Sequence, residues 1–131
     1  MTVDCPAETY AIRIWDDKDF TAIDDFFHQE AIIHSSLGKF TGSESMKQVV
    51  QTWQTAFPDL KIENQQIFRR NDCVSIHWKA EGHQTGDFKG FKPTGKKVSY
   101  TGVTLYRLNA NKIVEYWTYL NLNHIIDQLS G

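Results

Sequence analysis

Residues 112–121, KIVEYWTYLN, read as one β-strand and decide the fold. Side chains alternate along this stretch with the period of two that is typical of a strand. The alternation predicts two faces, of which one carries Ile113, Glu115, Trp117, Tyr119 and Asn121, and the other Val114, Tyr116, Thr118 and Leu120. Both faces are bulky, so we expect a central strand that is covered on both sides. The first face mixes aromatic rings with polar groups, a combination that is typical of a ligand pocket.

The strands around this stretch predict an antiparallel sheet that follows a group of helices. Helices are expected from Pro6 to about residue 15, over residues 20–27, over residues 41–57 behind a Thr41–Glu44 capping box, and over residues 122–129. Strands are expected at 31–35, 60–69, 73–88 and 98–108. Helices first and strands afterwards favour an α+β fold with the helices packed on one face of a curved sheet.

Length and composition limit the classes of function that the protein can have. A chain of 131 residues with a net charge of −2 predicts one domain over residues 1–131. The lysines between residues 89 and 97 surround glycine and proline, which favours a solvated loop over a nucleic-acid site. Two cysteines without a histidine at zinc spacing predict no metal site and a reducing compartment. No apolar run approaches membrane length, so we expect a soluble, cytoplasmic protein without a membrane partner.

Several short motifs, taken together, resemble the SnoaL-like polyketide cyclases of the nuclear transport factor two-like superfamily. They are Phe57-Pro58-Asp59-Leu60, Phe88-Lys89-Gly90, Pro93-Thr94-Gly95-Lys96, Lys112-Ile113-Val114-Glu115-Tyr116-Trp117 and Gln128-Leu129. The resemblance implies a cone in which a strongly bent sheet wraps around helices and encloses an apolar pocket, often in a dimer. It also implies ring closure on a polyketide-like carbonyl compound, with no metal and no organic cofactor.

Two positions depart from the family pattern, and both concern proton transfer. The family usually reads Gly-Thr-His-x-Gly in the long strand, whereas Gln84 stands at the position of that histidine. The family's acid/base aspartate follows the tryptophan by four residues, and here that position is Asn121. An amide donates and accepts hydrogen bonds but cannot take the proton that an aldol closure must move. Alternatively, Asn121 is simply the N-cap of the last helix.

His34 is the candidate that could replace the missing base. The resemblance allows a pocket-facing histidine on this short strand, and its unperturbed pKa near 6.5 suits base chemistry. Tyr119 is a possible acid but a poor base, because a phenol has an unperturbed pKa near 10. Glu115 lies about 20 Å along the strand from Asn121, too far to act on the same atom. A structural, hydrogen-bonded His34 and a structural Glu115 are the alternatives.

Glu115 is also a predicted ligand contact, and the remaining predicted contacts are aromatic or hydroxyl-bearing. They are Trp53, Trp78, Tyr100, Thr104, Trp117 and Tyr119. The two tryptophans Trp53 and Trp78 are equally consistent with core walls. The strand over residues 98–108 can face the pocket with Tyr100 and Thr104 or, in the opposite phase, with Thr101, Val103 and Leu105.

Three functions remain open at this point. The first is a cofactor-free cyclase, isomerase or hydrolase that acts on a small, largely apolar carbonyl compound. The second is a binding module that has kept the pocket and lost the proton relay. The third is an assembly domain, because the outward residues Val114, Tyr116, Thr118 and Leu120 would form an exposed apolar patch unless a second copy covers them. That patch predicts a homodimer.

Overall fold

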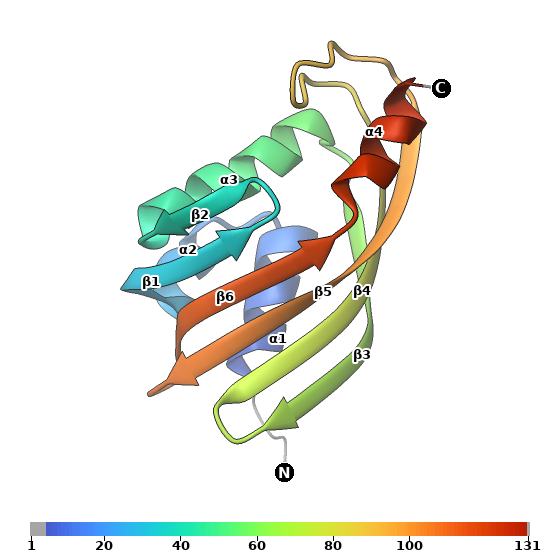
Figure 1. Cartoon of the computed structure of the whole chain (residues 1–131). Helices are drawn as coiled ribbons and strands as arrows, with labels where there is room; N and C mark the ends of the chain where they lie inside the picture. The colour runs from blue at the N-terminus through green and yellow to red at the C-terminus, as the bar shows by residue number, and fades with distance from the viewer. Residues whose placement is uncertain (1–4, 131) are drawn as a thin grey trace.

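The structure is a computed structural model that describes residues 5–130. In chain order the elements are α1 (Pro6–Ala11), a π-helical turn η1 (Ile12–Asp16), α2 (Thr21–Phe26), β1 (Phe27–Ser35), β2 (Gly38–Thr41), α3 (Ser43–Ala56), β3 (Lys61–Arg70), β4 (Cys73–His83), β5 (Lys97–Asn109), β6 (Lys112–Leu120) and α4 (Leu122–Ser130). Helices precede the long strands, as the sequence predicts (Figure 1).

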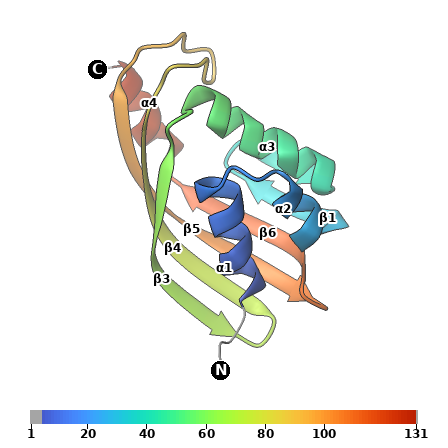
Figure 2. The same cartoon turned by 180° about the vertical axis from the view of Figure 1, so that it is seen from behind.

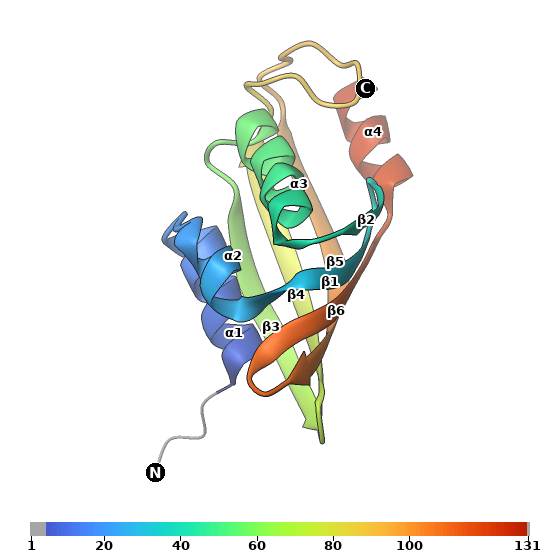
Figure 3. The ribbon, with the colours of Figure 1, turned by 90° about the vertical axis from the view of Figure 1, so that its left-hand side faces the viewer.

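The strands form one six-stranded sheet in the order β2-β1-β6-β5-β4-β3. Strand β6 lies inside the sheet, parallel to β1 and antiparallel to β5, which confirms the predicted central strand. Helices α1, α2 and α3 all lie against one face of the curved sheet (Figure 2), which we call the inner face. Helix α4 lies on the other side at one end of the sheet (Figure 3), and no other helix within residues 5–130 covers the outer face. This is the expected α+β cone.

The long strands β4 and β5 show which side chains are buried against the helices on the inner face. Their buried and exposed residues alternate regularly, so every second side chain points toward the helices. Trp78, Tyr100, Thr104 and Tyr106 are all buried and therefore face inward. Thr101, Val103 and Leu105 face outward, which decides between the two phases that the sequence left open.

A β-bulge in β6 changes which side chains of residues 112–121 face the pocket, compared with the prediction. Leu108 pairs with Ile113, but Arg107 pairs with Glu115, so Val114 is an extra residue without an opposite partner. One inserted residue exchanges the two faces for the rest of the strand. Tyr116, the first inward residue beyond it, is therefore buried. The prediction that Glu115, Trp117 and Tyr119 line the pocket, and that Tyr116, Thr118 and Leu120 point outward, is wrong.

The start of α3 also differs from the sequence expectation. Thr41 ends β2, a short strand that sequence patterns did not reveal, and α3 begins at Ser43 with Gly42 as its N-cap. Gly42 has φ of +99°, a conformation that glycine adopts readily and that makes this abrupt change from strand to helix possible. The Thr41–Glu44 capping box is therefore absent, and Glu44 instead pairs with Lys47 at 3.0 Å.

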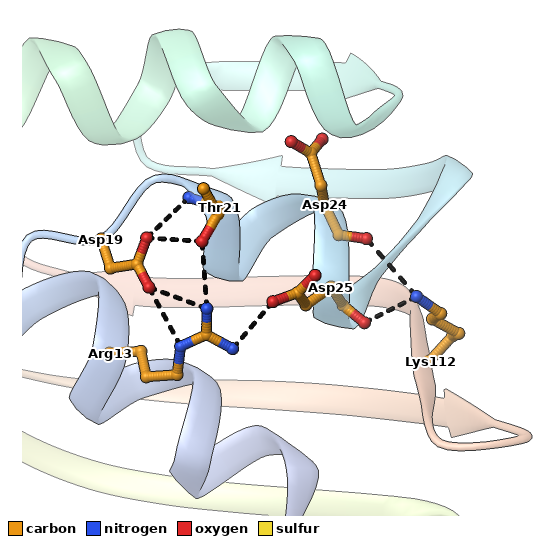
Figure 4. A network of polar contacts seen from close by, with 6 residues as sticks. All are labelled: Arg13, Asp19, Thr21, Asp24, Asp25 and Lys112. Carbon is orange, nitrogen blue, oxygen red and sulfur yellow. Dashed lines mark hydrogen bonds and ion pairs between the residues drawn. The ribbon is translucent and has the colours of Figure 1, made fainter.

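An ionic network fixes the N-terminal helices to each other and to the sheet (Figure 4). The Arg13 guanidinium contacts Asp19 at 2.7 Å and Asp25 at 2.9 Å, bridging η1 to α2. Asp19 accepts hydrogen bonds from the Thr21 amide and hydroxyl at the start of α2, and these bonds, with the Arg13 contact, hold the pKa of Asp19 below its ordinary value. Lys112 on β6 donates to the Asp25 carbonyl at the end of α2, where cations are favoured. The network sets how η1 sits over the inner face.

Candidate functional site

A narrow cavity lies between the helices and the inner face of the sheet. Its volume is about 40 Å³, room for about three water molecules. Its lining is mostly aromatic and aliphatic, with hydroxyl and amide groups as the polar part: Ala11, Trp15, Ser35, Ser36, Val49, Trp53, Leu60, Ile62, Asn64, Ile76, Trp78, Tyr100, Thr104, Tyr106, Tyr116, Thr118 and Leu120. A ligand larger than a few atoms therefore requires side chains to move.

Four of the predicted ligand contacts meet at this cavity. Trp53 on α3, Trp78 on β4, and Tyr100 and Thr104 on β5 all belong to its lining. The Tyr100 ring lies 5.8 Å from both indoles, nearly perpendicular to that of Trp78, so the three rings form one aromatic wall. Contact of these four residues with a ligand stays a prediction.

The turn η1 contributes a wall residue, Trp15, that the sequence analysis did not predict as a ligand contact. The Asp17 amide donates to the Ile12 carbonyl at 3.2 Å, a bond across five residues that widens the helix locally. Single π-turns of this kind occur often at functional sites. Trp15 lies within η1 and lines the cavity. The sequence places Trp15 at the end of the first predicted helix. A helical position alone does not distinguish a core contact from a cavity wall.

Buried hydroxyl groups supply the polarity of the cavity. The Trp78 indole nitrogen donates to the Thr104 hydroxyl at 2.9 Å, and the Thr104 and Thr118 hydroxyl oxygens lie 3.4 Å apart. Burial raises the pKa of Tyr116 to about 12, and the neighbouring Thr118 and Thr104 hydroxyls partly offset that rise. Burial also raises the pKa of Tyr106. These phenols keep their protons at neutral pH and are hydrogen-bond donors rather than bases.

The lining carries no side chain that is charged at neutral pH. Among the described residues around the cavity there is no Asp, Glu, His, Lys or Arg. A general base that works near pH 7 needs a pKa near that value, and neither a phenol nor a neutral amide offers one. The arrangement can orient a carbonyl group and stabilise negative charge on its oxygen, but it has no evident group that takes up a proton.

His34 comes together with two other predicted site residues, but on the outer face. Its Nε2 lies 2.8 Å from Glu115 Oε2, and its ring stacks on Trp117 with 5.3 Å between centroids. Arg107 completes this outer cluster, at 3.3 Å from the other Glu115 oxygen and 5.4 Å from the centre of the Trp117 ring. The expected pocket-facing position of His34 is therefore wrong. Tyr119, with 58% of its surface exposed, also lies on this outer face.

Gln84 lies outside the cavity and organises a loop. Its side chain is fully buried and donates to the Gly86 and Phe91 carbonyls at 2.9 and 3.1 Å. It accepts from the Thr94 amide and hydroxyl at 3.1 and 2.7 Å. The prediction that Gln84 is a polar group of the pocket is wrong, because the loop itself uses all of these bonds. Its link to the cavity is indirect, through Phe88 of the same loop, whose ring lies 5.1 Å from Trp53.

Asn121 is exposed at the start of α4. Its side-chain oxygen accepts a hydrogen bond from the His124 amide at 3.1 Å, the bond that defines an N-cap. It does not belong to the cavity lining. The prediction that Asn121 and Gln84 together form the polar part of one pocket is therefore wrong, and the N-cap alternative agrees with the observed contact.

Sequence comparison matches residues 7–129 to the family model described as SnoaL-like polyketide cyclase. The chain belongs to this family. Solved structures with the same fold include AclR from Streptomyces galilaeus, a proposed hydroxylase, at 26% identity and a TM-score of 0.81 over 96% of this chain and 83% of AclR. Another is a proposed SnoaL-like polyketide cyclase from Jannaschia sp. CCS1, at 19% identity and a TM-score of 0.87 over 99% of both chains.

IdmH from Streptomyces antibioticus, a proposed polyketide cyclase, is a third structural neighbour, at 24% identity and a TM-score of 0.81 over 98% of this chain and all of IdmH. At such identities the cyclase structures show a shared fold and no more. No curated protein sequence matches the chain.

Within residues 5–130, no helix is long and apolar enough to cross a membrane. The same residues hold no cluster of three or more His, Cys, Asp or Glu side chains that could hold a metal ion.

Proposed function

We propose that this SnoaL-like protein binds a small, largely apolar carbonyl compound in the cone cavity and transfers no proton with a residue of its own. The observation that carries the proposal is the lining: aromatic walls, a few hydroxyls, and no ionised side chain among the described residues. Apolar walls with few polar groups are typical of small-molecule sites.

A second candidate is a cyclase or isomerase that works through neutral donors alone. Family membership favours it, and so does the Tyr116 phenol, whose pKa of about 12 keeps it a donor beside any developing oxyanion. Solved neighbours described as a proposed hydroxylase and as proposed cyclases leave the reaction itself open. Such a catalyst would show a rate that is independent of pH between about 5 and 10, because no group of the lining titrates in that range.

We expect ligand binding without ring closure. Binding is measured by the fluorescence of the cavity tryptophans during titration with cyclic ketones, and turnover by the absorbance of a β-ketoester. The wild type and Asn121→Asp should both be inert in the second assay, because Asn121 lies at an exposed N-cap where aspartate caps equally well. His34→Ala should leave both results unchanged.

Turnover by the wild type that disappears in His34→Ala would overturn the proposal, because it would make His34 a base. Turnover that is independent of pH would favour the second candidate. Absence of any ketone binding would remove the small-molecule function altogether.

We further propose that two copies associate through the outer face of the sheet. Its apolar band lies on the adjacent strands β1, β6 and β5 and includes Ile32, Trp117, Tyr119, Val103 and Leu105. Phe68 on β3 lies on the same face, beyond β4. Phe68 and Tyr119 are 62% and 58% exposed. An apolar band of this extent is unusual on a monomer, and the resemblance to the family implies a dimer. This face replaces the one that the period-two pattern of residues 114–120 had indicated.

Tyr119→Glu is expected to weaken the dimer more than tenfold, because it buries a charge without a partner in the interface. Light scattering should give twice the 15.1 kDa monomer mass for the wild type and the monomer mass for the variant at the same micromolar concentration. Gln51→Glu, on the exposed side of α3, adds the same charge elsewhere and should remain dimeric. A monomeric wild type would contradict this proposal.

A further inference from the structure

The hydroxyl groups at the polar side of the cavity form a chain that starts at an indole. Trp78, Thr104 and Thr118 project inward from the adjacent strands β4, β5 and β6, and Thr104 pairs directly with Thr118. Trp78 Nε1 donates to Thr104 Oγ1 at 2.9 Å. Thr104 Oγ1 and Thr118 Oγ1 are 3.4 Å apart. Hydrogen bonding by both hydroxyls partly offsets the rise that burial causes in the pKa of the neighbouring Tyr116 phenol.

The indole sets the direction of this chain. An indole N–H can only donate, so the Thr104 oxygen is its acceptor, and the Thr104 proton must turn toward Thr118 or Tyr116. Burial keeps Tyr116 protonated, with a pKa raised to about 12. Each hydroxyl oxygen can accept two hydrogen bonds, so all three hydroxyl protons stay inside the cluster only if the three hydroxyls donate to one another in a closed ring.

An open chain that begins at Trp78 ends on a hydroxyl proton with no acceptor inside the cluster. A closed ring of the three hydroxyls would use that proton, but it needs the Thr104–Thr118 contact, whose 3.4 Å is beyond the 2.5–3.0 Å typical of a good O–H···O bond. An open chain from Thr104 through the Tyr116 phenol to Thr118 does not need that contact. The last donor is thus free to turn toward the cavity. Thr118 and Tyr116 both belong to the cavity lining, so a ligand can reach it.

We propose that the Trp78–Thr104–Tyr116–Thr118 chain is the binding point for one neutral hydrogen-bond acceptor, the carbonyl oxygen of the cavity ligand. The inference rests on the proposed function and adds the position and polarity of the contact. It also sets the charge of the ligand. A carboxylate would be desolvated without a cation among the described lining residues, so it should bind much more weakly than the neutral ketone.

A cationic ligand is the competing occupant, since aromatic walls bind quaternary ammonium groups through cation–π attraction. The rings of Trp53, Trp78 and Tyr100 would suit such a group. The donor end of the hydroxyl chain disfavours it, because a hydroxyl proton and a cation repel each other. The neutral acceptor is therefore the ligand that satisfies both the walls and the chain.

The test compares cyclopentanone with methylenecyclopentane, which has the same ring but a CH₂ group in place of the oxygen. The wild type should bind the ketone about 2- to 10-fold more tightly, the range of one net hydrogen bond. Thr118→Val should remove that preference while leaving the dissociation constant of methylenecyclopentane nearly unchanged. Thr118→Ser should restore the preference. Thr101→Val, the same kind of change on the outer face of β5, should keep it.

Equal binding of the two probes by the wild type overturns the inference alone, and so does a preference that survives both Thr118→Val and Thr104→Val. Tighter binding of tetramethylammonium than of cyclopentanone overturns it in favour of a cation site. If neither ring compound binds to any variant, the proposed function fails together with it.

Discussion

Gln84→Leu is expected to lower the free energy of unfolding by about 3 kcal/mol, since each buried polar group left without a partner costs about 1–3 kcal/mol. Leucine fills a similar volume but leaves the Gly86 and Phe91 carbonyls and the Thr94 amide without their side-chain partners. Gln84 itself has no exposed surface, so water cannot replace these bonds without opening the loop. Urea unfolding followed by circular dichroism measures the loss.

Gln84→Glu is the matched control, because its shape is nearly the same and only the donors and the charge change. The ionised carboxylate would face two carbonyl oxygens, so the folded-state pKa of the new residue should rise above the unfolded value of about 4.3. A raised carboxyl pKa means that the folded state binds more protons. The penalty relative to the wild type should therefore be small at pH 4, grow as the pH rises above about 4.3, and be largest at pH 8.

Gln84→His, which introduces the residue usual in the family, should also destabilise, since an imidazole cannot make all four of these bonds. A Gln84→Leu variant as stable as the wild type would show that the loop does not depend on these bonds. A Gln84→Glu penalty that does not change between pH 4 and pH 8 would refute the predicted burial of the charge.

Gly102→Ala is expected to cost about 2 kcal/mol and to disturb the cavity, because overpacking a tight site costs about 1–3 kcal/mol. A Cβ at this position would lie 2.4 Å from Cζ2 and 2.7 Å from Cη2 of Trp78, and 2.8 Å from the Tyr119 carbonyl oxygen. Real Cβ contacts are essentially never this short, so the indole must move. Its donation to Thr104 would then be lost, and ketone binding should weaken with it.

A double-mutant cycle separates this steric effect from a general effect of alanine in a strand. Trp78→Phe removes the ring that the new Cβ would strike, so the double variant should be more stable than the sum of the single losses by about 1 kcal/mol. Gly90→Ala serves as a control, since no atom lies within 4 Å of its Cβ and only its φ of +86° opposes the change. If the losses of unfolding free energy in the cycle were additive, they would contradict the inferred contact between a Cβ at position 102 and the Trp78 ring.

The architecture was predictable because it follows from patterns that span many residues. The alternation of β4 and β5, the apolar stripe of α3 and the order of helices and strands each rest on repeated evidence, so one misread residue does not change the result. Of the site, the aromatic wall of Trp53, Trp78 and Tyr100 was predictable for the same reason.

The positions of single polar residues were not predictable, since each depends on one local event. The Val114 bulge adds one residue without a sequence signal and exchanges the faces of Trp117 and Tyr116. The position of His34 was unpredictable for the same reason. His34 pairs with Trp117 in the parallel β1–β6 ladder, and this pairing places it on the outer face.

The sequence by itself determined the α+β arrangement of helices on one face of a curved sheet, the central place of β6 and the aromatic character of the cavity, because burial of apolar surface depends on periodicity. The cone shape was implied by the resemblance to the family. Only the tertiary structure decided which hydroxyls meet, that Gln84 serves a loop, and that His34 and Glu115 pair outside the cavity. Hydrogen bonds depend on distances of a few tenths of an ångström between residues far apart in the chain, and no spacing along the sequence fixes such distances.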